Sequence, residues 1–409
     1  MDLEKFRFIE YYLSMKVCII NNIYPPYHRG GAEQVVKRAV DGLLERGHEV
    51  VLITSTPEKD SVEQFGRLTI YRKKPFNVYF YTDAHKHNVL MRLLWHKIDI
   101  FQLQMAHWVK NVIKEENPDI IHTHNLMGLS FLIPRVIRRL GKPHIHTVHD
   151  VQLVEPSGLI IKQQETSWRY NGFPTKLYTW LMKFLIKSPL VIISPSQFLL
   201  DFYTSRGFFP DSQKEVVRNP LTVDGEVHHK KSDNDFHFLY IGQIEKHKGI
   251  FTLVEAFKHV KGAKLHILGS GSQEKTLREM TRENEHIILH GFVKREDLPE
   301  FFSKIDMTVV PSLCYENSPT VIFESFYFGI PVLASEIEGV AELIDGGENG
   351  LTFCAGDVVD LEKKITWCIK HQQEVQRMSS KTKTALQRLI SKDYITRLTE
   401  LYSQAQENR

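Results

Sequence analysis

The residues best suited to chemistry lie in the stretch 312–329, SLCYENSPTVIFESFYFG, directly after the apolar segment 307–310. Glu316 belongs to the short polar loop of this stretch, and Glu324 follows eight positions later, in a segment expected to be helical. A loop carboxylate at a strand end can face a ligand, and a carboxylate in the next helix can reach back along it. The two glutamates therefore bracket a candidate binding site, although a glutamate near a helix start can also serve only as a partner of the helix dipole.

The start of the expected helix supplies the second part of this site. Pro319 suits the first helical turn, because the N–H that proline lacks would have no partner there. The free backbone N–H groups of Ser318, Thr320 and Val321 would point out of the helix N-terminus, which favours an anion such as a phosphate. A strand end, an anion-binding helix start and two flanking carboxylates together suit a sugar attached to a nucleoside diphosphate.

The spacing of the two glutamates resembles that of a known family, the retaining glycosyltransferases of family 4, in which seven residues separate two glutamates. The segment ENSPTVIFE fits that spacing, and the following segment GIPVLAS resembles the family's continuation. The resemblance covers nearly the whole chain from Met15. It implies an α/β chain of GT-B fold, with two Rossmann-like domains, each a doubly wound parallel sheet, that face each other across a cleft.

The resemblance also implies the activity and the roles of the site residues. The family moves a sugar from a nucleoside-diphosphate sugar to an acceptor and retains the anomeric configuration. Glu316 would bind the hydroxyl groups of the donor sugar, and Glu324 would bind the ribose hydroxyls. The N–H groups near Ser318 and Thr320 would hold the diphosphate, and Val293, in the segment HGFV, would meet the base through its backbone.

The segment GQIEKHKG, residues 242–249, is the second specific match. The family pattern has an arginine directly after the first glycine and a lysine six positions after that glycine, and both neutralise the leaving diphosphate. This chain keeps Lys248 but has Gln243 where arginine is usual. Glutamine can donate a hydrogen bond but carries no charge. We therefore expect one charge-assisted contact fewer, with Lys248 and the helix N-terminus as the main phosphate contacts.

Two segments of the first half complete the expected site. Gly30 and Gly31 can let the backbone approach a ligand closely, although a simple tight turn would use the same pair. Their position resembles the family's glycine-rich loop, which implies a place over the donor phosphates. His149 resembles the histidine of the family's histidine–aspartate motif and would contact the donor sugar near the reacting carbon. Asp150 could orient it by accepting its Nδ1–H.

Histidines recur at two expected strand ends, in residues 122–124 and 144–149, and a His-x-His pair could bind metal. No cluster of carboxylates or cysteines appears at the spacing that a zinc site needs, so we favour no metal site. Asp233-Asn234-Asp235 has the Asp-x-Asp pattern that binds metal in a different glycosyltransferase fold. Here it lies in a charged segment before a strand, so we interpret it as part of a linker. We expect no cofactor, and the nucleoside-diphosphate sugar serves as co-substrate.

Length and composition bound the remaining possibilities. The 409 residues predict two or three domains, and 42% hydrophobic residues suffice for full cores. A net charge of +3 gives no strong attraction to nucleic acid. The four cysteines form no C-x-x-C pair and indicate reduced thiols in a cytosol. No apolar run approaches the roughly 18–20 residues that span a bilayer, and residues 1–14 lack a signal-peptide centre, which favours a cytoplasmic location.

Short apolar strands alternate with helical patterns in both halves, which predicts two parallel sheets. We expect an acceptor-side domain over 1–225, with 1–14 a loose extension, a nucleotide-sugar domain over 226–390, and a helix in 391–409 that crosses back to the first domain. The expected strands are 17–21, 50–54, 120–123, 144–148 and 191–194 in the first half, and 238–241, 265–268, 287–289, 307–310, 332–334 and 351–353 in the second.

The segment 175–187, TKLYTWLMKFLIK, combines apolar and aromatic residues with lysines at helical spacing. Such a helix could rest on an anionic membrane surface, or it could pack on its own domain with its lysines in water. Lipid-linked acceptors are frequent in the family. A glycan or lipid-linked acceptor, peripheral contact with the inner face of the plasma membrane, and a role in cell-surface polysaccharide or lipopolysaccharide synthesis therefore remain hypotheses.

Two other functions fit the same fold. A nucleotide-sugar epimerase would need no acceptor, so a product formed without acceptor would identify it. A non-catalytic nucleotide-sugar-binding partner is favoured by Gln243, and binding without turnover would support it. A large gain in turnover on Gln243→Arg would show that a charge is missing from the native site.

Overall fold

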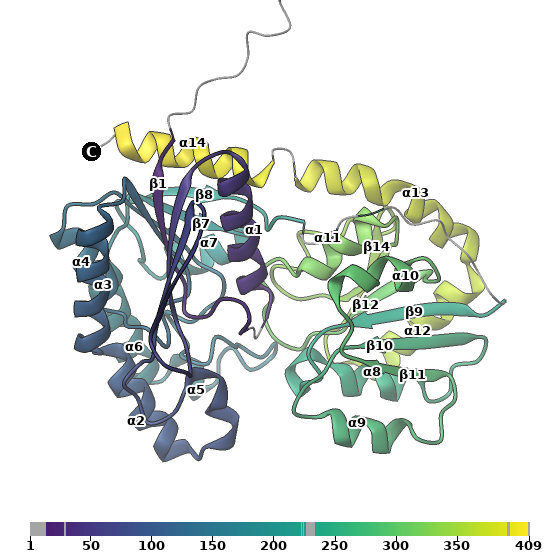
Figure 1. Ribbon diagram of the computed structural model, residues 1–409. Helices are drawn as coiled ribbons and strands as arrows, with labels where there is room; N and C mark the ends of the chain where they lie inside the picture. Colours follow the sequence, from purple (N-terminus) through teal and green to yellow (C-terminus); the bar gives the residue numbers. More distant parts are fainter. Residues whose placement is uncertain are drawn as a thin grey trace, which may run out of the picture.

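The computed structural model describes residues 14–27, 30–221, 223, 225, 234–390 and 393–407. These residues form two α/β domains that lie side by side, as the sequence predicts (Figure 1). Apart from Ser14, the expected N-terminal extension lies outside the described residues, as does most of the expected linker over 227–235.

The first domain is built on an eight-stranded sheet with the order β3-β4-β2-β1-β5-β6-β7-β8. Neighbouring strands are parallel except for the antiparallel pair β3–β4. The central strands are buried along almost their whole length, as expected for a parallel sheet covered on both faces. The strands are β1 (Lys16–Ile20), β2 (Glu49–Ser55), β3 (Ser61–Phe65), β4 (Leu68–Lys73), β5 (Ile120–Thr123), β6 (His144–Thr147), β7 (Val191–Ser194) and β8 (Gln213–Val216).

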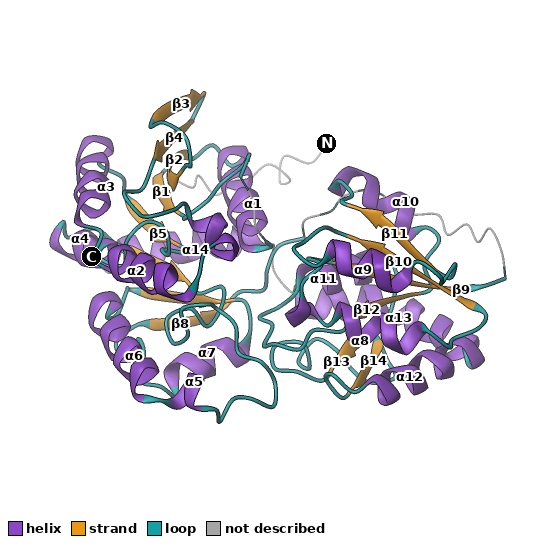
Figure 2. Cartoon of the chain, turned by 90° about the horizontal axis from the view of Figure 1, so that it is seen from below, coloured by secondary structure: helices purple, strands orange, loops and turns teal. Residues whose placement is uncertain are grey.

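Helices cover both faces of this sheet (Figure 2). One face carries α2 (Val89–Ile100), α3 (Leu103–Glu116), α4 (Ile133–Arg139), α6 (Phe173–Ile186) and α7 (Gln197–Thr204), whose inner residues share one hydrophobic core. The other face carries α1 (Ala32–Glu45) and α14 (Tyr394–Glu407). Two short helices, η2 (Tyr81–Lys86) and α5 (Trp168–Asn171), lie in the connections.

The second domain has a six-stranded, wholly parallel sheet with the order β11-β10-β9-β12-β13-β14. Its strands are β9 (Phe236–Ile241), β10 (Ala263–Leu268), β11 (Ile287–Gly291), β12 (Met307–Val310), β13 (Val332–Ser335) and β14 (Gly350–Phe353). Its helices are η3 (Lys246–Lys248), α8 (Ile250–Phe257), α9 (Glu274–Thr281), η4 (Arg295–Asp297), α10 (Leu298–Phe302), α11 (Thr320–Tyr327), α12 (Val358–Lys370) and α13 (Gln372–Leu389).

The strands expected from apolar runs are all present within one or two residues, and three further strands were not predicted. These are β3 and β8, at the two edges of the first sheet, and β4, whose residues alternate between buried and partly exposed. In β3 and β8 one side of the strand faces solvent, so polar residues replace the apolar run that marks a central strand.

The C-terminal helix α14 lies on the first domain, far in sequence from its neighbours (Figure 1). Leu398, Leu401 and Tyr402 are fully buried in one cluster with β1 residues such as Val17. The hydroxyl of Tyr402 lies 2.7 Å from Nδ1 of His122, at the end of β5. The last helix of the chain therefore completes one face of the first domain.

Five buried histidines lie on β5 and β6 or directly after these strands. Burial lowers the pKa of each: to about 3 for His146, to about 4 for His149, and well below the ordinary value for His122, His124 and His144. Their ring nitrogens bond to neutral partners, such as the Thr123 hydroxyl 2.8 Å from His146 Nδ1. These imidazoles are therefore neutral in the folded protein near pH 7.

This cluster should make the fold sensitive to acid. The unfolded chain binds protons at these histidines below pH 6.5, while the folded chain does not, so the free energy of unfolding should decrease from pH 6.5 towards pH 4. Each histidine contributes up to about 1.4 kcal/mol per pH unit. Urea unfolding at several pH values gives the free energy of unfolding as a function of pH. Between pH 6.5 and pH 4 this free energy should decrease less steeply for His146→Gln than for the native chain. Equal slopes for the two proteins would contradict this origin of the acid sensitivity.

Candidate active site

The predicted site residues gather where the carboxyl ends of the two parallel sheets meet, the usual place for ligands in such folds. His149 follows β6 of the first domain, and Gln243 follows β9 of the second. Glu316 lies in the loop between β12 and α11, as the apolar pattern predicts. Residues from both domains thus contribute to one region.

Lys248 and Glu316 form the charged centre of this region. Nζ of Lys248 lies 2.5 Å from Oε1 of Glu316, and the Ser312 hydroxyl donates to the same oxygen at 2.7 Å. The two charged side chains are only 27% and 14% exposed. Burial acts to lower the pKa of Lys248, but the Glu316 carboxylate more than offsets this and leaves that pKa above its ordinary value. The lysine therefore stays charged at neutral pH.

Two glycines allow the backbone to bring this pair together. Gly249 has φ +72°, and a Cβ there would lie 1.7 Å from the carbonyl oxygen of Pro311. Gly339 has φ +80°, and a Cβ there would lie 1.6 Å from the carbonyl oxygen of Glu316 itself. Only glycine fits such a close approach with a positive φ. Gly339 is not recognisable from the local sequence, because its contact lies 23 residues earlier in the chain.

The start of α11 carries no side-chain cap, which leaves its first N–H groups for another partner. The helix begins at Thr320, and Pro319 is the N-cap residue rather than part of the first turn. Ser318 adopts φ +91° and its carbonyl oxygen accepts a hydrogen bond from Asn219 Nδ2 at 2.9 Å. The Ser318 hydroxyl is buried and hydrogen-bonds to no group that the structure describes. This helix start can therefore take a phosphate.

The glycine-rich loop of the first domain lies against this helix start. The Glu33 carboxylate, itself buried, accepts the backbone N–H of Gly30 at 2.9 Å and so fixes the loop. A Cβ on Gly31 would lie 4.0 Å from the Thr320 methyl group. Gly31 and Thr320, predicted independently to contact the donor phosphates, are thus neighbours across the domain boundary.

The second glutamate is held by a residue that the sequence did not single out. Oε1 of Glu324 lies 2.6 Å from Nη1 of Arg295, and the Glu324 side chain is 3% exposed. Arg295 lies two residues after Val293, which packs in an apolar cluster with Leu298 and Phe328. No local pattern distinguishes Arg295 from the surrounding charged residues. Its pairing connects the expected base-binding segment to the expected ribose-binding glutamate.

Gln243 lies in a turn that is fixed by close backbone contacts. Its carbonyl oxygen accepts a hydrogen bond from the Tyr240 hydroxyl at 2.7 Å. A Cβ on Gly269 would lie 1.9 Å from the carbonyl oxygen of Gly242, and a Cβ on Gly271 would lie 2.4 Å from that of Ile244. The Gly-x-Gly turn after β10 therefore permits this loop to approach.

His149 reaches the rest of the site through its backbone. Its carbonyl oxygen accepts from Asn317 Nδ2 at 3.1 Å, which ties it to the residue after Glu316. Its Nε2 lies 2.9 Å from Nδ1 of His124. Oδ1 of Asp150 accepts the backbone N–H of Gln152 at 2.8 Å and so shapes the loop after β6. The orienting role expected for Asp150 stays a prediction.

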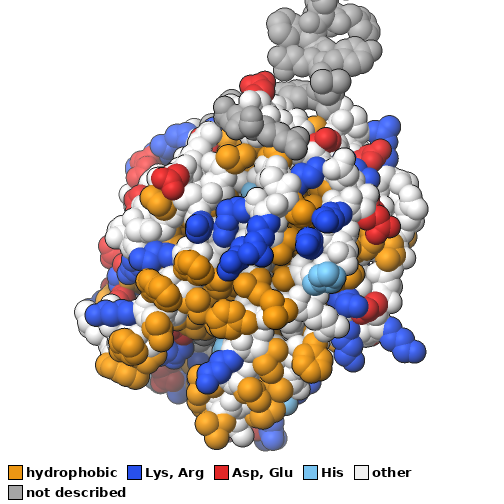
Figure 3. All heavy atoms as spheres, turned by 90° about the vertical axis from the view of Figure 1, so that its left-hand side faces the viewer, with side chains coloured by type: hydrophobic (Ala, Val, Ile, Leu, Met, Phe, Trp, Pro, Cys, Tyr) orange, Lys and Arg blue, Asp and Glu red, His pale blue; other side chains and the backbone are white. Residues whose placement is uncertain are grey.

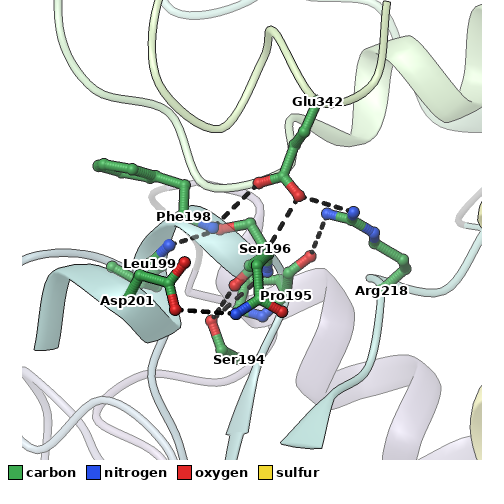
Figure 4. A network of polar contacts seen from close by, with 9 residues as sticks. Ser194, Pro195, Ser196, Phe198, Leu199, Asp201, Arg218 and Glu342 are labelled. Carbon is green, nitrogen blue, oxygen red and sulfur yellow. Dashed lines mark hydrogen bonds and ion pairs between the residues drawn. The ribbon is translucent and has the colours of Figure 1, made fainter. Parts of the chain in front are cut away.

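A network at the domain junction joins three further segments (Figure 4). Glu342 of the second domain accepts from Arg218 Nη2 at 2.7 Å and from the backbone N–H groups of Gln197 and Phe198, at the start of α7, at 3.2 and 3.3 Å. Nη1 of Arg218 donates to the carbonyl oxygen of Pro195. The carboxylate thus caps a helix of the other domain and fixes how the two domains meet.

Two general features of the chain bear on the site. Among the described residues, no group of three or more His, Cys, Asp or Glu side chains is arranged to hold a metal ion. Within that same part of the chain, no helix has both the length and the apolar character to cross a bilayer.

Two family models match the chain and together cover most of it. The model described as Glycosyltransferase Family 4 matches residues 29–224, and the model described as Glycosyl transferases group 1 matches residues 226–385. An uncharacterized 42.6 kDa protein in the cps region of Klebsiella pneumoniae is 26% identical over 332 residues, which is 80% of this chain and 87% of that protein. An uncharacterized glycosyltransferase of Methanocaldococcus jannaschii is 24% identical over 356 residues, 82% and 84% of the two chains.

Solved structures of glycosyltransferases share the fold. Sucrose-phosphate synthase from Thermosynechococcus elongatus superposes with a TM-score of 0.75 at 17% identity, over 97% of this chain and 100% of that one. HepE from Anabaena, in complex with UDP, has a TM-score of 0.69 at 16% identity, over 95% and 100%. The chain therefore belongs to the group 1 glycosyltransferases, with an N-terminal domain of the family 4 type, and is a glycosyltransferase of GT-B fold.

Proposed function

We propose that this glycosyltransferase is a retaining enzyme that moves a sugar from a nucleoside-diphosphate sugar to a glycan or lipid-linked acceptor. The observation that carries the proposal is the pairing of Lys248, in η3, with Glu316, 2.5 Å away in the loop that leads to the uncapped start of α11. HepE, of the same fold, is seen with UDP and with UDP-glucose. The relatives in a cps region and in lipopolysaccharide core biosynthesis support a role in cell-surface polysaccharide or lipopolysaccharide synthesis.

In the proposed site some groups stabilise negative charge and others orient the donor. Lys248 and the N–H groups at Thr320 lie where the leaving diphosphate gains negative charge, and such fixed groups stabilise a transition state strongly. Glu316 binds the donor-sugar hydroxyls, and Glu324 turns from Arg295 to the ribose hydroxyls. His149, whose pKa burial lowers to about 4, is neutral and positions the sugar. Because Lys248 and the N–H groups at Thr320 supply the positive charge, the proposed reaction needs no metal.

The proposed reaction exchanges one bond at the anomeric carbon for another. The bond from that carbon to the diphosphate oxygen breaks, and the electron pair leaves with the diphosphate. The acceptor hydroxyl oxygen bonds to the same face of the sugar, and its proton passes to the departing phosphate oxygen. Closure of the domains would exclude water, which could otherwise hydrolyse the donor.

The binding half of this proposal is tested by thermal shift with UDP-, GDP-, ADP- and dTDP-sugars. A donor at 100 times its Kd should add roughly 2.7 kcal/mol to the free energy of unfolding of the native chain. Glu324→Ala should lose most of that shift, because the ribose contact is gone. Glu348→Ala is the matched control, since Glu348 lies in the turn before β14 and its carboxylate pairs with Lys381 of α13. No shift with any donor, or an equal loss in both variants, would contradict the assigned site.

A second candidate function is a nucleotide-sugar-binding partner without catalytic activity, favoured by Gln243 in place of the usual arginine. The same site would then bind a donor without transferring its sugar. Sugar transfer by the native chain to any acceptor would exclude this candidate.

A further inference from the structure

One side of the first domain exposes an unusual amount of hydrophobic surface. On α6, Phe173, Leu177, Trp180 and Phe184 recur every three or four residues, so they share one side of the helix. They are 50–74% exposed. The opposite side of the same helix packs Met182, Leu185 and Ile186 into the core. The helix thus packs on its own domain and still presents a complete apolar stripe to the outside.

The neighbouring helix α2 has the same character. Leu90, Leu93 and Leu94 are 45–77% exposed, while Trp95 and Ile100 enter the core that α6 also joins. Trp168, just before α6, is 74% exposed. We name these exposed residues of α2, α5 and α6 the apolar face. Figure 3 shows a broad hydrophobic area on this side of the molecule. Contiguous apolar patches of this kind mark binding surfaces rather than ordinary protein surface.

A band of positive charge adjoins the apolar face. The sequences of α2, α4 and α6 hold seven Lys and Arg residues and a single acidic residue, Asp99, which is fully buried. A groove between α4 and α6 is lined by Arg135, Arg138, Arg139, Phe184 and Lys187. In Figure 3, Lys and Arg side chains gather directly beside the hydrophobic area. The surface therefore joins an apolar part to a cationic part with no exposed acid on these three helices.

Arg138 has a structural part in this surface. It donates to the carbonyl oxygens of Ile186 and Leu185 at 2.6 and 2.9 Å, which satisfies the C-terminal end of α6 and joins that helix to α4. Arg135, Arg139 and Lys187 are exposed. These three cations are thus available to an anionic partner.

We propose that this surface docks on an anionic phospholipid bilayer, with the apolar face at the headgroup–acyl boundary and the arginine groove on headgroup phosphates. The apolar stripe and the adjoining cations match the chemistry of that boundary. A second copy of this chain fits less well, because a two-fold contact would bring the same cationic band against itself. The inference rests on the proposed function in one respect, that the acceptor is presented at a membrane. It extends the membrane contact expected for 175–187 to α2 and α4.

The segment that leads into α5 and α6 crosses to the second domain before those helices begin. The backbone N–H of Lys162 donates to the carbonyl oxygen of Leu313 at 2.8 Å, and Nζ of Lys162 pairs with Glu338 at 2.5 Å. The chain then enters α5 and α6. Docking through α6 would therefore hold the loop that crosses to Glu316 close to the membrane, where a lipid-linked acceptor is presented.

Cosedimentation with vesicles tests the proposal on the full chain. The native protein should bind vesicles that contain phosphatidylglycerol much more tightly than vesicles of phosphatidylcholine alone, and less tightly at high salt. The triple variant Arg135→Gln, Arg139→Gln, Lys187→Gln should weaken binding on the order of 100-fold. The triple variant Leu177→Ser, Trp180→Ser, Phe184→Ser should also lose binding. The matched control Lys261→Gln, Lys275→Gln, Lys363→Gln removes the same charge from the second domain and should bind as the native chain does.

The proposal would be overturned if the native chain did not bind anionic vesicles, or if the control variant lost as much vesicle binding as the Arg135→Gln, Arg139→Gln, Lys187→Gln variant. It would also be overturned by a stable dimer in sedimentation that the variant Leu177→Ser, Trp180→Ser, Phe184→Ser abolishes. Donor-induced thermal shifts are measured on every variant. Unchanged shifts show that each variant is folded and that its donor site is intact. A failure of vesicle binding alone therefore leaves the proposed chemistry standing, and a failure of the donor shift in the native chain leaves the docking surface standing.

Discussion

Replacing Lys248 by methionine should lower kcat by about 10²–10³-fold, the usual effect of removing one fixed group that stabilises a developing negative charge. The effect should be large here because the family pattern uses two cations, at positions 243 and 248, to neutralise the diphosphate. In this chain position 243 is the uncharged Gln243, so Lys248 is the one cation of that pair. The measurement is the initial rate of sugar transfer at saturating donor. Lys246→Met is the matched control, since it removes the same charge from an exposed position in the same 3-10 turn.

The stability of these variants separates charge from structure. Lys248→Met leaves the largely buried Glu316 carboxylate without its cation and should destabilise the fold by about 1–3 kcal/mol. Adding Glu316→Gln removes that uncompensated charge and should restore much of the stability without restoring activity. A full-rate Lys248→Met enzyme, or a Lys246→Met enzyme with the same loss, would contradict the role given to Lys248.

Gly339→Ala should be among the most damaging single substitutions in the second domain. The added methyl would lie 1.6 Å from the carbonyl oxygen of Glu316, at a residue with φ +80°. The backbone of the Glu316 loop would have to move, and we expect a loss of more than about 3 kcal/mol in the free energy of unfolding, or a displaced and inactive site. Urea unfolding and the transfer rate measure the two consequences.

Gly347→Ala provides the control for this prediction. Gly347 has the same φ of +80°, but a Cβ there would meet nothing within 4 Å. Its cost should be only that of the backbone conformation, about 1–2 kcal/mol, with activity kept. Equal costs for the two variants would show that the contact with Glu316 has no energetic weight.

The sequence predicted the architecture well because the central strands are buried on both faces and are rich in apolar residues. The runs that became β5, β7 and β12 show this directly, since each is fully buried. The edge strands β3 and β8 face solvent and carry polar residues, so no apolar run marked them. An apolar run was what marked a strand: β11 was predicted from Ile-Ile-Leu although it lies at a sheet edge and is only partly buried.

Candidate site residues could be proposed from the sequence where the family pattern fixes a local spacing. Glu316 and Glu324 were found through their spacing, as was Lys248 six positions after Gly242. Arg295 was not predicted, because its partner Glu324 lies 29 residues away and only the fold brings them together. Gly339 was not predicted either, because its contact with Glu316 is also made only in the folded chain. The pairing of Lys248 with Glu316, 68 residues apart, could likewise be seen only in three dimensions.

The exposed side of α6 shows another limit of the sequence. The segment 175–187 was compatible with a helix that rests on an anionic membrane surface and with a helix packed on its own domain. The structure shows that one side of α6 packs in the core while the other remains apolar and exposed. Only the positions of α2 and α4 beside it reveal a surface, because their residues lie 34–97 positions away in the sequence.

Retaining sugar transfer between the two domains is the central claim, and the stereochemistry of the product tests it most directly. The native chain, its stabilising donor and a panel of glycan and lipid-linked acceptors are incubated, and the anomeric configuration of the new linkage is read by proton NMR at early times. A donor with an α-linked sugar should give an α-linked product, formed only when an acceptor is present and much more slowly by Lys248→Met. A β-linked product, or an altered sugar nucleotide formed without any acceptor, would contradict the account.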